Sequence, residues 1–230
     1  MKKSILFGIA VSAMVLGANV ASAADGALPP SWSGFYGGIE LGYASVGGQI
    51  YDYNNYYAPT AWTDASRGSN ALLGGKIGYD FDTGGNVVIG LSANVKALLG
   101  EDANCSSAGL CSNGANGQPH LSFGVKGLAS LDARAGLLIS PETLFFVEGG
   151  LAFGDVVTHH RDNEEYDGSS HLMTGFDVGV GIEHKVSENV SLVLDARYYD
   201  LGAIDVKSTG ETFGFKPRVF ETSIGFNVHF

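Results

Sequence analysis

The sequence has few cysteines, few prolines and few basic residues for a chain of 230 residues. It contains 2 cysteines, 6 prolines and 13 lysines or arginines, against 24 aspartates or glutamates. The net charge of −11 excludes nucleic acid as an expected partner, because an acidic chain repels phosphate. Beyond the first two dozen residues no long uninterrupted apolar run occurs, which excludes a helical membrane protein. Disorder is also not expected, since the chain is dense in Phe, Val and Leu despite its 34 glycines.

The N-terminus has the pattern of a secretory signal peptide. The basic start Met1-Lys-Lys3 precedes an apolar run from Ile5 to Leu16, and Ala21-Ser-Ala23 is a small-x-small cleavage site. This order predicts that residues 1–23 are cleaved on export. An uncleaved anchoring helix is the alternative, but the apolar run is shorter than the ~20 residues that a spanning helix needs.

Cys105 and Cys111 lie six positions apart in a segment rich in Gly, Ser and Asn. In an exported protein, an even and closely spaced pair predicts a disulfide. A metal site is the alternative, but it needs two further ligands and the segment offers only His120.

After a periplasmic linker expected over residues 24–34, apolar and polar residues alternate in separate segments of residues 35–230. A period of two predicts strands with one apolar and one polar face. The expected strands cover about residues 35–46, 69–81, 87–99, 121–139, 145–153, 176–183, 190–199 and 219–230.

The connections between these strands alternate strictly in length. Short turns are expected at residues 82–86, 140–143 and 187–189, and long loops at about 48–67, 100–120, 155–171 and 200–216. An even strand number with alternating short and long connections is typical of a membrane barrel, and closure leaves no unpaired edge in lipid. The pattern predicts an all-β fold, an eight-stranded antiparallel up-and-down transmembrane β-barrel.

The polar strand face carries many charges interleaved with Gly and Ser, whereas the apolar face carries almost none. The charged residues are Glu40, Lys76, Asp80, Lys96, Asp132, Arg134, Glu148, Asp177, Glu183, Asp195, Arg197 and Glu221. Buried charges must be paired, so we expect an ion-pair network inside the lumen. The alternative is a soluble eight-stranded carrier with its apolar face inward, but so much strand Gly is unusual on a solvent surface.

Five motifs carry a family resemblance that covers essentially the whole mature chain. They are Trp32-Ser-Gly-Phe-Tyr-Gly-Gly38, Gly149-Gly-Leu-Ala-Phe-Gly154, Gly179-Val-Gly-Ile-Glu183, Leu194-Asp-Ala-Arg-Tyr-Tyr-Asp-Leu-Gly202 and the ending Gly225-Phe-Asn-Val-His-Phe230. The chain resembles the small porin-like surface antigens of the outer membrane, often called outer-membrane immunogenic proteins.

This resemblance implies a location in the Gram-negative cell outer membrane, with outer-membrane lipid and lipopolysaccharide as partners. It also implies insertion by the outer-membrane assembly machinery, with Phe226, Val228 and Phe230 as the assembly signal. The penultimate His229 and the cysteine segment are not part of the family pattern.

The expected function follows from the width of the barrel. Eight strands enclose a lumen just wide enough for side chains to fill, so we expect a plugged barrel with a structural or surface-interaction role. A narrow porin for small solutes or ions is the first alternative. No enzymatic activity is expected, because no nucleophile motif accompanies the histidines.

The segment 155–171 is the most charged in the chain and contains His159, His160 and His171. Some relatives of the family bind haem, and imidazole is a natural iron ligand, so a haem-binding surface protein is the second alternative, with divalent-metal capture beside it. No other cofactor is expected. Tyr51, Tyr53, Tyr56 and Tyr57 favour a contact surface for a host or cell-surface ligand, and the alternative is that these tyrosines pack on one another.

Overall fold

The structure is a computed structural model that describes residues 31–52, 62–104, 120–162, 165–208 and 211–230. The predicted signal peptide and both cysteines, Cys105 and Cys111, lie outside the described residues. No helix in the described part of the chain is long and apolar enough to span a membrane.

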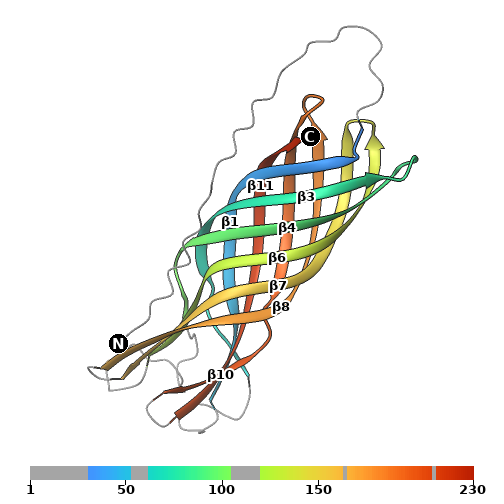
Figure 1. The fold of residues 1–230 in the computed structure, drawn as a ribbon. Coiled ribbons are helices and arrows are strands. Elements are labelled where there is room, and N and C mark those ends of the chain that lie inside the picture. Colours follow the sequence, from blue (N-terminus) through green and yellow to red (C-terminus); the bar gives the residue numbers. More distant parts are fainter. Residues whose placement is uncertain (1–30, 53–61, 105–119, 163–164, 209–210) are drawn as a thin grey trace.

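Eight long strands, each antiparallel to its neighbours, follow one another around the molecule (Figure 1). They are β1 (Gly34–Asp52), β3 (Gly68–Asp82), β4 (Val87–Gly100), β6 (His120–Ser140), β7 (Thr143–Asp162), β8 (Glu165–Lys185), β9 (Val190–Asp200) and β11 (Glu211–His229). The last strand pairs with the first, from Tyr36 opposite His229 to Asp52 opposite Phe213, and closes the barrel. The predicted eight-stranded antiparallel barrel is therefore confirmed.

The two ends of the barrel differ. One end, here called the turn end, carries the three short turns, which lie between β3 and β4, β6 and β7, and β8 and β9 as predicted. The opposite loop end carries three short strands, β2 (Thr63–Asp64), β5 (Ala103–Asn104) and β10 (Ile204–Ser208). In Figure 1 the loop end lies at the bottom, around β10.

The prediction of a long loop over residues 155–171 is wrong. The β7–β8 ladder continues without interruption to Asp162 opposite Glu165. Inward and outward positions still alternate in this part of β7, although fewer of the residues are apolar. Val156 and Thr158 are buried, whereas Val157 between them is only partly buried. Likewise, β1 continues to Asp52, and β10 with the start of β11 occupies much of the loop expected over 200–216. The backbone hydrogen bonds of a hairpin extend a ladder beyond the apolar band, where polar residues take over.

Large apolar side chains face outward along the middle of every long strand. Ile39 is 67 % exposed, Leu91 63 % and Leu151 61 %. A continuous apolar belt of this kind would be an aggregation surface in water, but it is the normal outer surface of a membrane barrel. Aromatic residues border it at both ends: Phe35 packs on Tyr79 at the turn end with ring centroids 4.7 Å apart, and Tyr198 lies opposite Phe220 towards the loop end.

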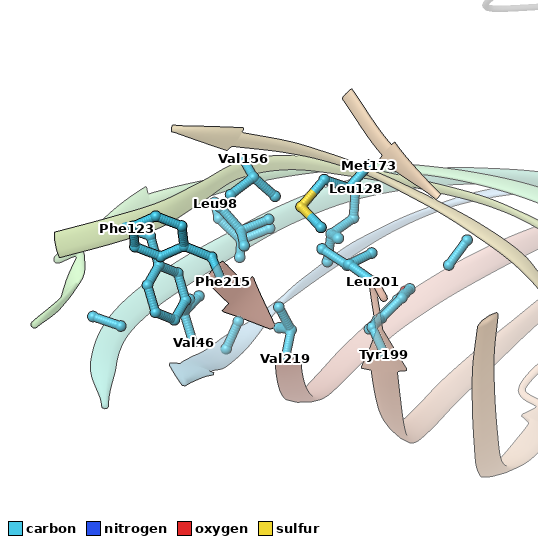
Figure 2. Packing of buried hydrophobic residues seen from close by; sticks show 14 of the residues in the cluster. Val46, Leu98, Phe123, Leu128, Val156, Met173, Tyr199, Leu201, Phe215 and Val219 are labelled. Atoms are coloured by element: carbon cyan, nitrogen blue, oxygen red, sulfur yellow. The ribbon is translucent and has the colours of Figure 1, made fainter. Parts of the chain in front are cut away.

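The barrel interior holds two separate groups of buried apolar side chains. The turn-end cluster consists of Trp32, Val88, Leu144, Phe146 and Val193. The loop-end cluster, most of which is drawn in Figure 2, consists of Ala44, Val46, Ile50, Leu72, Leu98, Ala103, Phe123, Val125, Leu128, Ala152, Val156, Met173, Tyr199, Leu201, Phe213, Phe215 and Val219. Between the two lies the charged part of the lumen.

Candidate functional site: the charged lumen

All twelve charged side chains predicted on the polar strand face lie inside the barrel, and none is more than 8 % exposed. Every second residue of a strand points into the barrel. Charged residues two positions apart, such as Asp132 and Arg134 or Asp195 and Arg197, therefore share the inward face. The strand registers bring these positions to similar heights in the lumen, where they form three linked groups of ion pairs.

The group nearest the turn end is centred on Arg134. One nitrogen of its guanidinium lies 3.0 Å from Asp80 Oδ2, and another donates to Glu183. The guanidinium also lies over the ring of Phe146, 4.0 Å from its centroid. Arg134 therefore joins the charged layer to the turn-end cluster.

The central group is built around Arg197, whose side chain is fully buried. Its Nη1 atom lies 2.6 Å from Asp132 Oδ2 and 2.7 Å from Asp177 Oδ2, and its Nη2 atom donates to Glu148. Four strands, β6, β7, β8 and β9, are thus tied together by one guanidinium. The planar fork of Arg suits such multiple carboxylate contacts better than a Lys would.

The third group contains both lysines. Lys96 Nζ lies 2.9 Å from Glu40 Oε1 and also donates to Glu221. Lys76 Nζ lies 3.4 Å from Asp195 Oδ2 and 3.7 Å from Glu40 Oε2. These contacts join side chains of β1, β3, β4, β9 and β11 inside the lumen.

Neutral side chains complete the network, and their part in it was not predicted from the sequence. Asn94 and Ser130 donate to Asp132 at 2.7 and 2.8 Å, and Ser223 donates to Asp195 at 2.9 Å. Asn227 donates to Glu183 at 2.9 Å. Each occupies an inward position of its strand, so the same alternation that located the charges also locates these residues.

Among the buried side chains of the described residues, eight are acidic and five are basic, with Lys185 near the turn end as the fifth basic one. Some buried carboxylate oxygens, including Asp132 Oδ1 and Asp177 Oδ1, consequently have no hydrogen-bond donor among the described residues. The excess is negative, so any ion that the lumen admitted would be a cation.

The segment Ser31–Ser33 packs against the turn-end mouth of the barrel, although it was expected to belong to a periplasmic linker. Trp32 is 1 % exposed, and its indole nitrogen donates to the Pro141 carbonyl at 3.0 Å. Lys185 Nζ lies 4.8 Å from the Trp32 ring centroid and donates to the Ser31 carbonyl. An amphipathic ring with one polar partner suits this position at the turn-end mouth.

Comparison with known proteins assigns this architecture to a family. Residues 10–230 match the sequence profile described as the outer membrane protein β-barrel domain. The chain belongs to this family.

The family resemblance inferred from the sequence is therefore confirmed, and the protein is an outer-membrane β-barrel. It is 26 % identical over 213 residues to the 31 kDa outer-membrane immunogenic protein of Brucella melitensis, covering 87 % of this chain and 84 % of the relative.

Solved barrels resemble the chain in fold alone. The outer membrane protein OprG from Pseudomonas aeruginosa superposes with a TM-score of 0.50 at 12 % identity, covering 89 % of this chain and 100 % of OprG. Neisserial surface protein A superposes with a TM-score of 0.44 at 16 % identity, covering 86 % of this chain and 98 % of that protein.

The strand register of this outer-membrane barrel separates the loop histidines. His171 lies opposite Val156, which is buried in the loop-end cluster, so His171 shares the inward face. His159 is three positions from Val156 along β7 and therefore lies on the opposite face. The side chain of His160 lies outside the described residues.

No group of three or more His, Cys, Asp or Glu side chains in the described ranges could hold a metal ion. His159 Nε2 instead lies 3.3 Å from Asp102 Oδ2, and Asp102 Oδ1 accepts a hydrogen bond from Lys126 at 2.7 Å. The structure does not bring His159 and His171 together as a haem or metal site.

A Ser, a His and a Glu do meet at the turn end, in Ser191, His229 and Glu183. However, Ser191 Oγ and Glu183 Oε1 both lie against His229 Nε2, at 3.0 and 3.1 Å. A catalytic triad requires the acid and the nucleophile on different ring nitrogens. Trp32 also packs edge-on against His229, with centroids 5.9 Å apart, so this contact is structural.

Proposed function

We propose that the protein is a non-conducting outer-membrane barrel with a structural or surface-interaction role and no enzymatic activity. The observation that carries the proposal is the presence of three groups of buried side chains in the barrel interior. The turn-end cluster, the charged network and the loop-end cluster follow one another between the two mouths.

The apolar clusters and the charged layer oppose the passage of ions by different mechanisms. The two apolar clusters would strip water from an ion without offering replacement ligands. The charged layer would have to open contacts such as Arg197 with Asp177 and Asp132, and separating a buried pair costs about 3–5 kcal/mol. A narrow porin for small solutes or ions is the alternative, and the excess of carboxylates in the lumen favours it.

The loop end supplies the surface for interactions. The β7–β8 hairpin extends to Asp162 and Glu165, about ten residues past the aromatic level of Phe153 and Phe176. A ladder of this length carries the backbone of both strands beyond the aromatic level, which favours contact with a host or cell-surface ligand. The similarity to an outer-membrane immunogenic protein of Brucella melitensis supports a role at the cell surface.

Osmotic swelling of proteoliposomes tests the proposal against the porin alternative. Residues 24–230 would be refolded into liposomes, with folding confirmed by the gel-mobility shift on heating, and diluted into sugars of graded size. We expect swelling no faster than in empty liposomes, whereas a general porin incorporated in the same way swells rapidly. Swelling that depends on sugar size would establish the narrow porin instead.

A further inference from the structure

The part of β8 near the loop end has a neighbouring strand on one side only. On the β7 side the ladder continues without interruption to Asp162 opposite Glu165. On the other side, β8 pairs with β9 only as far as Phe176 opposite Asp200. Among the described residues, 165–175 therefore have no strand partner on that side, and they form an open edge about 35 Å long at a rise of ~3.3 Å per residue.

The edge opens because the chain after β9 turns away from β8 at Gly202. This glycine has a positive φ of 74°, a conformation that glycine adopts without strain. Its amide donates to Asp200 Oδ1 at 3.0 Å, which fixes the turn. The strand that follows, β10, pairs with β11, so it gives β8 no partner beyond this point.

The backbone groups at the open edge belong to alternate residues of β8. Consecutive residues of a strand direct their N–H and C=O groups to opposite sides. The Val186 amide, just after β8, donates to the Val190 carbonyl on the β9 side, and the β8 register has no shift. Counting back in twos, the residues beyond Phe176 that direct their backbone groups towards the open edge include Leu172, Ser170, Gly168 and Tyr166.

The sequence of this edge lacks the usual protection against an added strand. Natural sheets block open edges with lysine, proline or a bulge. Residues 165–175 contain no lysine and no proline, and the β7–β8 ladder has no bulge. The Leu172 side chain is 70 % exposed, so no described residue covers the edge there. Such an edge is a template for a further strand.

The charges beside this edge select the kind of strand that it pairs with. Within residues 155–162 and 165–175, four residues are acidic and one is basic, namely Asp155, Asp162, Glu165, Asp167 and Arg161. An excess of negative charge attracts a basic segment and repels an acidic one.

The edge lies beyond the membrane boundary and is accessible to a protein in water. Leu172 is four residues past Phe176, which belongs to the aromatic level. This separation is about 13 Å along the strand and about 9 Å in height for a strand tilted by ~45°. Aromatic girdle residues mark the membrane–water interface, so an extended segment can approach β8 without entering the hydrocarbon.

We propose that the edge of β8 from Tyr166 to Leu172 binds an extended, basic segment of a partner protein as an added β-strand. Backbone hydrogen bonds supply the affinity, and the surrounding carboxylates select positively charged side chains. This inference rests on the surface-interaction part of the proposed function and specifies the partner class. It does not depend on whether the lumen conducts.

Fluorescence anisotropy with labelled peptides and the refolded mature barrel in neutral detergent tests the edge. The probe is a ten-residue peptide that alternates Lys and Val. One comparison peptide is N-methylated along its backbone, which removes its hydrogen-bond donors and keeps its charge, and another carries Glu in place of Lys. The test variant is Leu172→Pro, which removes an edge-facing amide and leaves the β7 ladder intact. The matched control, Leu172→Ala, keeps that amide.

We expect the basic peptide to bind the unsubstituted barrel and Leu172→Ala within about twofold of each other. Leu172→Pro should bind it at least about tenfold more weakly, because a carbonyl of the added strand loses its donor. The N-methylated peptide should bind the unsubstituted barrel at least about tenfold more weakly for the same reason. The gel-mobility shift on heating confirms that each variant is folded.

Equal binding of the basic peptide to Leu172→Pro and Leu172→Ala would overturn the proposal. Tight binding of the N-methylated peptide to the unsubstituted barrel would overturn it independently of any variant, because charge alone would then explain the attraction. An acidic peptide that bound as tightly as the basic one would overturn the partner class. If no peptide bound, the inference would fail while absent liposome swelling still supported the non-conducting barrel, so the two failures are distinguishable.

Discussion

Replacing Arg197 with methionine is expected to destabilise the folded barrel by about 3–5 kcal/mol, because it removes one partner of a buried ionic group. Methionine fills much of the same volume without the charge. Arg197 has no exposed side-chain surface and contacts Asp132, Asp177 and Glu148. After the substitution, three carboxylates share an interior site without their common cation.

The cost stays within this range because the site retains other donors. Asp132 keeps its hydrogen bonds from Asn94 and Ser130. Neutralising Glu148 in the same chain, as Arg197→Met with Glu148→Gln, should recover part of the loss, since one fewer unpaired charge is buried.

Urea titration of the barrel in phosphocholine vesicles, followed by the heat-dependent gel-mobility shift, measures the free energy of unfolding. Arg218→Met is the matched control, because Arg218 forms a single, partly exposed contact with Asp200 at 3.3 Å and should cost no more than about 1 kcal/mol. If both substitutions destabilised the barrel equally, or if Arg197→Met cost less than about 1 kcal/mol, the ion-pair network would not stabilise the folded barrel.

Three further substitutions probe the lipid face, the strand glycines and the turn-end packing by the same titration. Leu91→Arg places a charge in the apolar belt and should cost about 2–4 kcal/mol; a neutral effect would contradict a lipid-facing position. Gly181→Ala would set a Cβ 2.4 Å from the Phe146 ring and should cost about 1–3 kcal/mol, whereas Gly85→Ala, with no atom within 4 Å, should be nearly silent. Trp32→Ala should cost about 3 kcal/mol, and an unchanged stability would mean that Trp32 does not pack in the barrel mouth.

The strand number and the inward charges could be predicted because both depend on a period of two. Within the apolar belt, residues such as Ile89 and Leu91 alternate with Gly90 and Ser92. Lipid on one side and a narrow lumen on the other impose opposite chemistry on neighbouring positions, so the pattern is strong. The three short turns could be predicted as well, because each joins two of these alternating segments.

Beyond the apolar belt that contrast disappears. At the loop end both strand faces meet water or packed side chains, so the sequence alone predicts a loop for residues 156–158, which belong to β7. Phe213 and Phe215 did alternate with Gly214 and Lys216, and this signal could have located the first residues of β11. The loop-end cluster depends on these extensions.

Packing at the turn-end mouth was not predictable, because a single aromatic residue such as Trp32 has no periodic signal. Its position depends on tertiary contacts with Pro141 and Lys185, which lie more than a hundred residues away in sequence. The separation of His159 from His171 is likewise set by strand register, which the sequence did not specify across the hairpin.

Single-channel conductance in a planar bilayer tests most directly the claim that the lumen is filled by its own side chains. The sample is the refolded mature protein, with insertion confirmed by its heat-dependent gel mobility. The structure predicts a silent membrane at all moderate voltages. Discrete and reproducible current steps, altered by Glu148→Gln or Arg197→Met, would contradict the filled lumen and make the protein a small pore.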